Sequence, residues 1–199
     1  MKLIAGLEPN DMRVINVEIA DTEKVAMTFS GGMDSTLLLY MLLKDREERG
    51  LNTEIHCYTA TQCGTRIHSQ KVLALPEFAG KVTHHIDVDN PINESVRPVT
   101  RKLLDEGWIV YGASNQIPLE DIGGRLPMRH PKNPDDPDNR LPFLFLFKYH
   151  ILDAYRKLGI EHLLKTTHTC TEQEHGECGQ CFACRERDWA FAKLGITKQ

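Results

Sequence analysis

Residues 25–29 form an apolar stretch that runs directly into a glycine pair and then into an amphipathic helix. This junction constrains the fold more than any other part of the chain. The stretch predicts a buried strand, and apolar residues on one side of residues 35–48 predict the helix. Gly31 and Gly32 permit the tight turn between them. A strand, a glycine turn and a helix in this order gather free amide groups and the positive end of the helix dipole around an anion such as phosphate.

The same turn carries side chains that suit phosphate and metal ions. Its serine and threonine hydroxyls can donate to phosphate oxygens. Asp34 can cap the helix or help to hold Mg²⁺ beside phosphate oxygens. The stretch lacks the Lys-Ser/Thr ending of a Walker loop and the spacing of a dinucleotide fingerprint. It matches in full the SGGxDS signature of the PP-loop ATP pyrophosphatase family. The resemblance implies that the following residues bind ATP: Ser30, Gly31, Gly32, Asp34, Ser35 and Thr36.

Predicted strands and helices alternate along most of the chain. Repeated strand–helix units of this length favour a doubly wound α/β fold, in which helices cover both faces of a parallel sheet. Residues 14–19 could add an edge strand. The predicted strands span residues 25–29, 54–58, 82–88, 108–111 and 162–166. The predicted helices span residues 35–48, 68–75, 93–106, 148–158 and 182–194.

Residues 113–141 are rich in proline and glycine and follow the fourth predicted strand. They therefore leave the sheet at the edge where ligands bind in open α/β folds. We predict a mobile lid that becomes ordered around substrate and nucleotide, and a plain surface loop is the alternative. Arg125 and Arg129 in this stretch, and Arg66 after the second strand, are candidates for binding an anionic substrate. Arginine suits this role because its guanidinium group forms paired hydrogen bonds with a carboxylate.

Four of the six cysteines lie within residues 170–184. Two overlapping CxxC steps present three thiolates from one turn, and the fourth thiolate comes from the preceding loop. Four thiolates complete the tetrahedral shell of Zn²⁺ and leave no open position, which is typical of a structural site. An iron–sulfur cluster and a site that uses His168 or His175 are the alternatives. The predicted zinc ligands are Cys170, Cys178, Cys181 and Cys184.

The two other cysteines have different predicted surroundings. Cys57 lies in an apolar strand and is predicted to be a buried thiol, since free cysteine behaves as a small hydrophobic residue. Cys63 lies in a predicted loop after that strand, where a position close to the substrate is one interpretation.

Composition narrows the class of protein. The net charge is −4, whereas a protein that mainly binds nucleic acid usually has a basic excess, so we expect a small-molecule substrate. No secretory signal is present, and no apolar run approaches the ~20 residues of a membrane-spanning helix. These features predict a cytoplasmic protein without membrane contact. The 199 residues fit a single domain, with a nucleotide-binding core at 25–166 and a zinc-binding segment at 167–199.

The phosphate loop and the cysteine cluster, in this order, resemble the 7-cyano-7-deazaguanine synthase family of the PP-loop class. That family ends in Thr-Cys, a short spacer, CGxCxxC and a helix, as residues 169–185 do here. Residues 141–148 and 155–159 resemble the family segment that places a lysine near ATP. Residues 110–112 resemble its fourth strand.

This resemblance implies an ATP-dependent ligase that converts 7-carboxy-7-deazaguanine and ammonia into a nitrile. ATP would adenylate the carboxylate, ammonia would form the amide, and a second ATP would drive dehydration of the amide. Lys148 would be the catalytic cation that faces the ATP phosphates, acting with Asp34. The resemblance also implies a homodimer. Two alternatives stay open: another PP-loop enzyme that transfers sulfur or modifies tRNA, and a non-catalytic nucleotide-binding relative.

Overall fold

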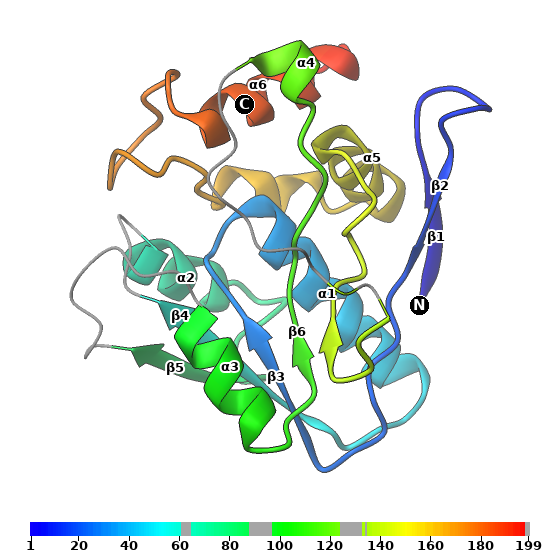
Figure 1. Cartoon of the computed structure of the whole chain (residues 1–199), viewed down its shortest axis with the longest axis vertical. Helices are drawn as coiled ribbons and strands as arrows, with labels where there is room; N and C mark the ends of the chain where they lie inside the picture. Colours follow the sequence, from blue (N-terminus) through cyan, green and yellow to red (C-terminus); the bar gives the residue numbers. More distant parts are fainter. Residues whose placement is uncertain (61–64, 88–96, 124–132, 134, 198–199) are drawn as a thin grey trace.

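The computed structural model describes residues 1–60, 65–87, 97–123, 133 and 135–197 (Figure 1). Its centre is a five-stranded sheet in which every neighbouring pair of strands is parallel. The strand order is β5-β4-β3-β6-β7, so the chain builds outward on one side of β3 and then crosses to the other side. The strands are β3 (Lys24–Thr28), β4 (Glu54–Ala60), β5 (Thr83–Asp87), β6 (Val110–Tyr111) and β7 (Asn139–Arg140).

Helices cover both faces of this sheet (Figure 1). Alternate residues of β3 point to opposite faces: Val25 and Met27 belong to the main core with α1 and α5, whereas Ala26 packs with Leu103 of α3. This alternation is the period-2 pattern of a strand buried on both sides. The helices are α1 (Met33–Glu48), α2 (Thr65–Leu73), α3 (Arg97–Asp105), α4 (Leu119–Ile122), α5 (Lys148–Leu158) and α6 (Phe182–Lys193).

The predicted doubly wound α/β fold is confirmed, and most elements lie close to their predicted bounds. α5 begins and ends at the predicted residues because Gly159 adopts the left-handed conformation, with φ of 67°, that stops the helix. The predicted helix over residues 93–106 is described only from Arg97 onward. No helix of the described residues is long and apolar enough to cross a membrane.

The prediction of a strand at residues 162–166 is wrong. Residues 162–165 lie in a 3-10 helix, Glu161–Lys165, and Thr166 follows it as its C-cap. The amide of Leu163 donates to the carbonyl of Ile160, at 3.0 Å, which is the i to i+3 pattern of such a helix. Leu163 and Leu164 are both buried. Adjacent buried residues also occur in a strand that is covered on both faces, which is why the apolar stretch is consistent with a strand.

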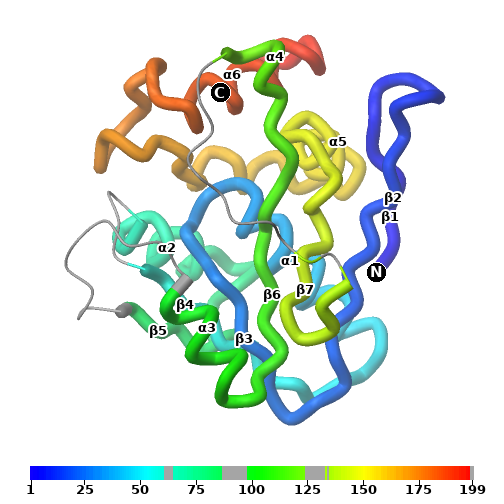
Figure 2. Tube along the Cα trace, in the orientation of Figure 1, coloured from blue at the N-terminus to red at the C-terminus, as the bar shows by residue number. Residues whose placement is uncertain are grey.

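The interpretation of residues 14–19 as an edge strand is confirmed only for their first part, and that strand does not belong to the main sheet. β2 (Arg13–Asn16) pairs antiparallel with β1 (Lys2–Ala5) in a separate two-stranded sheet. Figure 2 shows this hairpin alongside α5, apart from the parallel strands. Contacts with α5 hold it there: among them, the Lys157 ammonium donates to the carbonyl of Ile4, and the Asp153 carboxylate accepts from the amide of Gly6.

Residues 113–141 are more than the single long loop that the sequence predicted. Their first part contains α4, which is held to α6 by the Arg185 guanidinium donating to the carbonyl of Ile122, at 3.0 Å. Their last part forms β7, the fifth parallel strand, through pairing with β6. A two-residue strand carries too little pattern to be recognised in a sequence. The predicted lid motion stays a prediction, because most of the middle of this stretch lies outside the described residues.

Candidate active site and metal centre

A cavity of about 300 Å³ opens between the carboxyl ends of β3 and β6. The strand order reverses between these two strands, and open α/β sheets bind their ligands at such a point. The cavity walls come from five parts of the chain: the turn after β3, residues 113–115 after β6, the first turn of α5, the segment around His168, and the start of α6. Residues far apart in the sequence therefore meet at one edge of the sheet.

The turn after β3 has the geometry of an anion site. Gly32 is the N-cap of α1, and the first amide that donates within the helix is that of Thr36, to the carbonyl of Gly32. The three preceding amides of α1 therefore have no acceptor within the helix. The Ser30 and Ser35 hydroxyls lie 3.2 Å apart beside them. Amides and hydroxyls at the positive end of a 16-residue helix favour a bound phosphate.

Gly31 shapes this turn. Its φ is 74°, in the left-handed region that favours glycine. A Cβ at this position would lie 2.5 Å from the amide nitrogen of Ser69 and 2.6 Å from the carbonyl carbon of His68. The turn thus packs directly on the backbone of α2, and it needs a residue without a side chain.

Lys148 brings a buried positive charge into the same cavity. The side chain of Lys148 is 5% exposed, and its ammonium pairs with the carboxylates of Asp34 and Glu186. The distance from Lys148 Nζ to Glu186 Oε2 is 3.2 Å. The other oxygen of Glu186 accepts a hydrogen bond from the Asn115 amide, at 2.7 Å. Helices α1, α5 and α6 thus meet in one network of charged groups.

The network shifts the pKa of two of its members. Burial lowers the pKa of Lys148, but the attraction of Asp34 and Glu186 outweighs burial and raises that pKa above its usual value. Burial raises the pKa of Glu186, and the nearby charge of Asp34 adds to this effect while Lys148 opposes it. The two raised pKa values are consistent with each other. Two carboxylates attract the one ammonium, and that ammonium balances only one of the two negative charges.

The predicted site residues have different positions relative to the cavity. Four of the predicted ATP-binding residues line it: Ser30, Gly32, Asp34 and Ser35. Gly31 packs against the backbone of α2, and Thr36 is fully buried. Arg66 lies exposed on α2 and does not line the cavity. Arg125, Arg129 and Cys63 lie outside the described residues.

The four clustered cysteines form a second centre beside this cavity. Their sulfur atoms all lie within 4.8 Å of one another, with Cys170 and Cys181 at 3.9 Å and Cys178 and Cys184 at 4.0 Å. A tetrahedral ion with metal–sulfur bonds of about 2.3 Å needs sulfur atoms about 3.8 Å apart. The donor set and spacing therefore fit one metal ion. A four-iron cluster would need a wider cage, since it places several metal ions between the thiolates.

Two stacked histidines join the cysteine loop (residues 170–184) to the phosphate loop (residues 30–36). The rings of His68 and His168 have centroids 3.9 Å apart and are nearly parallel. Each imidazole forms a hydrogen bond with a backbone carbonyl of the cysteine loop. His68 contacts the carbonyl of Glu174, and His168 contacts the carbonyl of Gln173. The amide of His168 donates to the carbonyl of Gly31, at 3.1 Å. His175, the other rival ligand, has its ring 6.5 Å from that of His68.

Sequence reasoning missed Glu186 and Asn115 as site residues, and it considered His168 only as an alternative metal ligand and not as part of the cavity. A signal for Glu186 was present in α6. Ala183, Glu186, Arg187 and Ala190 follow helical spacing on one buried face, so two charged residues occupy positions where apolar residues are expected. Such buried charges need partners and are frequent at functional sites. The sequence carries no comparable signal for Asn115.

The profile of the queuosine biosynthesis protein QueC matches residues 138–195 of this chain. This segment contains Lys148, Glu186 and the complete cysteine cluster. The 7-cyano-7-deazaguanine synthase of Pseudoalteromonas atlantica is 26% identical to this chain over an alignment of 214 residues. The alignment covers 86% of this chain and 94% of that protein. The family resemblance is confirmed. The similarity supports an enzyme of the QueC family, with a cysteine cluster that could bind a metal ion.

Among solved structures, the U34-tRNA thiolase NcsA from Methanococcus maripaludis, with its [4Fe-4S] cluster, is a structural neighbour. It superposes with a TM-score of 0.47 at 14% sequence identity, covering 88% of this chain and 67% of that chain.

Proposed function

We propose that this protein is an ATP-dependent carbon–nitrogen ligase that converts 7-carboxy-7-deazaguanine and ammonia into 7-cyano-7-deazaguanine. The observation that carries the proposal is the position of Lys148. Its ammonium is buried at the phosphate loop, in a cavity at the switch point of the sheet. The similarity to a 7-cyano-7-deazaguanine synthase along most of the chain supports the choice of substrate.

In this proposal the start of α1 binds the ATP phosphates. The free amides of its first turn and the hydroxyls of Ser30 and Ser35 donate to phosphate oxygens. Lys148 stabilises the negative charge that develops when pyrophosphate leaves, and a buried cation is effective there because little water screens it. Asp34 suits Mg²⁺: its Oδ1 is buried and has no hydrogen-bond partner among the described residues, so an oxygen ligand is available.

The proposed reaction has three stages. A carboxylate oxygen of the substrate attacks the α-phosphorus of ATP, and pyrophosphate leaves. Ammonia then attacks the acyl carbon, which forms the amide and releases AMP. The amide oxygen then attacks the α-phosphorus of a second ATP and a second pyrophosphate leaves. Loss of AMP, with the oxygen, and of the two protons of the amide nitrogen leaves the nitrile. The cavity walls from α6 and residues 113–115 shelter the mixed anhydride from water.

The cysteine cluster has a structural role in this proposal. Cys170, Cys178, Cys181 and Cys184 hold one Zn²⁺ with no open position for substrate. The ion braces the segment that carries His168 and the start of α6, both of which line the cavity. The protein acts in the cytoplasm as a homodimer and does not bind nucleic acid.

The direct test supplies the protein with Mg·ATP, ammonia and 7-carboxy-7-deazaguanine. We expect AMP and pyrophosphate, with a nitrile product whose mass is seen by mass spectrometry. Lys148→Met should abolish AMP formation, and Lys44→Met, a change of an exposed lysine on α1, should leave it intact. Release of ADP, or AMP formation that requires tRNA in place of the deazapurine, would contradict the proposal.

A further inference from the structure

The cavity at the phosphate loop carries an unexpected charge. ATP has several negative charges, yet the network in this cavity contains two carboxylates, Asp34 and Glu186, and one ammonium, Lys148. All three residues line the cavity, so their charges act on whatever enters it. The described acidic and basic groups of the lining therefore sum to −1. A bare polyphosphate would be repelled by this network, because buried charges are only weakly screened.

The two carboxylates differ in how their oxygens are engaged. Both oxygens of Glu186 have partners: Asn115 Nδ2 lies 2.7 Å from Oε1, and Lys148 Nζ lies 3.2 Å from Oε2. Asp34 uses only Oδ2 for Lys148, and its buried Oδ1 has no hydrogen-bond partner among the described residues. Both oxygens of Glu186 are thus engaged by protein groups, whereas Asp34 has one oxygen available to bind a cation. A buried carboxylate oxygen without a partner is costly, and a metal ion that arrives with the nucleotide would satisfy it.

The fold holds Glu186 firmly in this position. It lies on the inward face of α6, and its residue is 2% exposed. The next residue, Arg187, donates to the carbonyl of Leu164 and to the hydroxyl of Thr169, which ties this face of α6 to the cavity wall. Glu186 therefore cannot turn to solvent when an anion enters, and its charge stays in the cavity.

We propose that Glu186 is a specificity-determining residue that makes the cavity accept ATP as its magnesium complex and reject ATP without metal. It does so in two ways. Its fixed negative charge opposes the bare polyphosphate, and its bond to Lys148 retains that ammonium at the phosphate loop when Asp34 turns to the metal ion. This inference rests on the proposed function, since it concerns the ATP that the reaction uses.

The test measures ATP affinity with and without Mg²⁺ by calorimetry, in wild type and in Glu186→Gln. Mg²⁺ is removed from the buffer with a resin and without a soluble chelator, so that the metal of the cysteine cluster stays in place. In wild type we expect ATP to bind much more tightly with Mg²⁺ than without it. In Glu186→Gln we expect this ratio to fall at least ten-fold, mainly because ATP binds more tightly without metal. Glutamine has the shape of glutamate and its oxygen can still accept from Asn115, while the uncharged amide nitrogen that replaces Oε2 no longer attracts Lys148.

Three controls make the result specific. Glu174→Gln makes the same chemical change at an exposed position of the cysteine loop and should leave the ratio unchanged. Glu186→Asp keeps the charge and should retain the preference of wild type. Asp34→Asn should also lower the ratio, but through weaker binding of Mg·ATP. The two carboxylates are therefore distinguished by which of the two affinities changes.

Two outcomes would overturn the inference, and both leave the ratio unchanged in a folded Glu186→Gln variant. In the first, neither affinity changes. In the second, both affinities fall by the same factor, which would make Glu186 a support for Lys148 alone. If wild type binds no ATP under either condition, the proposed function itself fails, and this result is distinct from the other two.

Discussion

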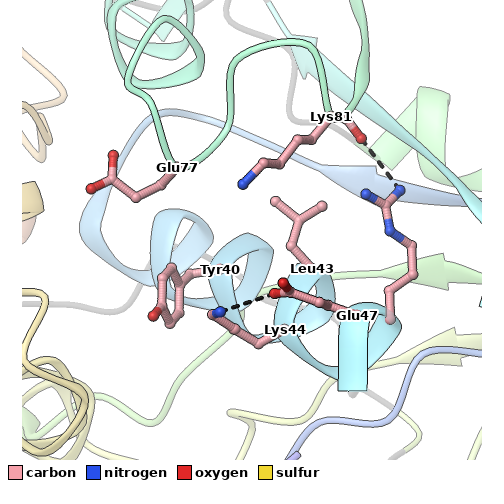
Figure 3. Close-up of a pocket in the computed structure, with 7 residues that line it drawn as sticks. Tyr40, Leu43, Lys44, Glu47, Glu77 and Lys81 are labelled. Atoms are coloured by element: carbon pink, nitrogen blue, oxygen red, sulfur yellow. Dashed lines mark hydrogen bonds and ion pairs between the residues drawn. The ribbon is translucent and has the colours of Figure 1, made fainter. Parts of the chain in front are cut away.

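Two cavities border α1, and they differ in what surrounds them. The one at the first turn of α1 measures about 300 Å³, and the other, along the last turns of the same helix, about 500 Å³. Figure 3 shows the second cavity, with Tyr40, Leu43 and Lys44 of α1 facing Glu77 and Lys81. The larger cavity is the less plausible active site, so volume is a poor guide here.

The difference lies in the burial of the charged groups. In the larger cavity Lys44 pairs with Glu47, and their side chains are 42% and 72% exposed, so water screens both charges. Arg46 donates to backbone carbonyls of Thr53 and Lys81. In the smaller cavity the ammonium of Lys148 is almost completely buried between carboxylates. Burying a charge costs free energy because the charge loses its water, and a buried charge acts strongly on a ligand. The buried charges therefore indicate that the smaller cavity is the functional one.

The largest effect is expected from loss of the metal at the cysteine cluster. The C-terminal segment that holds this cluster lines the smaller cavity and does not line the larger one. In Cys181→Ser we expect no bound metal, lost ATP binding and a marked rise in amide exchange over residues 167–193. Structural zinc contributes about 10 kcal/mol or more to small domains, so the local loss should be large. The last turns of α1 should keep their protection. Cys57→Ala removes a buried thiol outside the cluster and should retain the metal. If the amides of residues 167–193 stay protected from exchange in the metal-free variant, the smaller cavity does not depend on the metal, and the contrast between the two cavities fails.

A matched pair of lysine variants should give the next largest effect. Lys148→Met leaves two buried carboxylates without a counter-charge, and we expect a loss of about 3 kcal/mol in the free energy of unfolding and at least a hundred-fold loss of Mg·ATP affinity. Lys44→Met should change neither measurably. The folded-state pKa of Lys148 is raised, so its contribution is fully present at neutral pH and is lost only as the pH rises past 10.5 and through that raised value. Similar losses in both variants, in denaturant titration and calorimetry, would contradict the assignment of the site.

The smallest effect is expected at the rim of the larger cavity. The hydrogen bond from His162, at 2.7 Å, lowers the pKa of Glu77. The stabilisation from a lowered carboxyl pKa is present above the unfolded value of 4.5 and is lost as the pH falls through the folded value. Glu77→Gln should therefore cost less than about 1 kcal/mol at pH 7 and nothing at strongly acidic pH, since water screens this pair. Unfolding curves across pH measure the difference. A change in ATP affinity in Glu77→Gln would give the larger cavity a role that its geometry does not suggest.

The sequence by itself predicted the features that depend on neighbouring residues. The strand, glycine turn and helix of the phosphate loop lie within one stretch, so their spacing alone predicts an anion site. The cysteine cluster was equally readable, because CxxC steps present thiolates from one turn and the four sulfur atoms do lie close together. The alternation of strands and helices predicted the α/β class for the same reason.

Only the tertiary structure decided which distant side chains complete the cavity. Lys148 and Asp34 are 114 residues apart, and Asn115 and Glu186 are 71 apart, so no local pattern connects them. The family resemblance pointed to Lys148, but the partners of its ammonium depend on how α5 and α6 pack against α1. The two-residue β7 likewise forms only through pairing with β6. Local geometry is encoded by contiguous residues, whereas a buried charge network exists only after helices from the whole chain have packed around it.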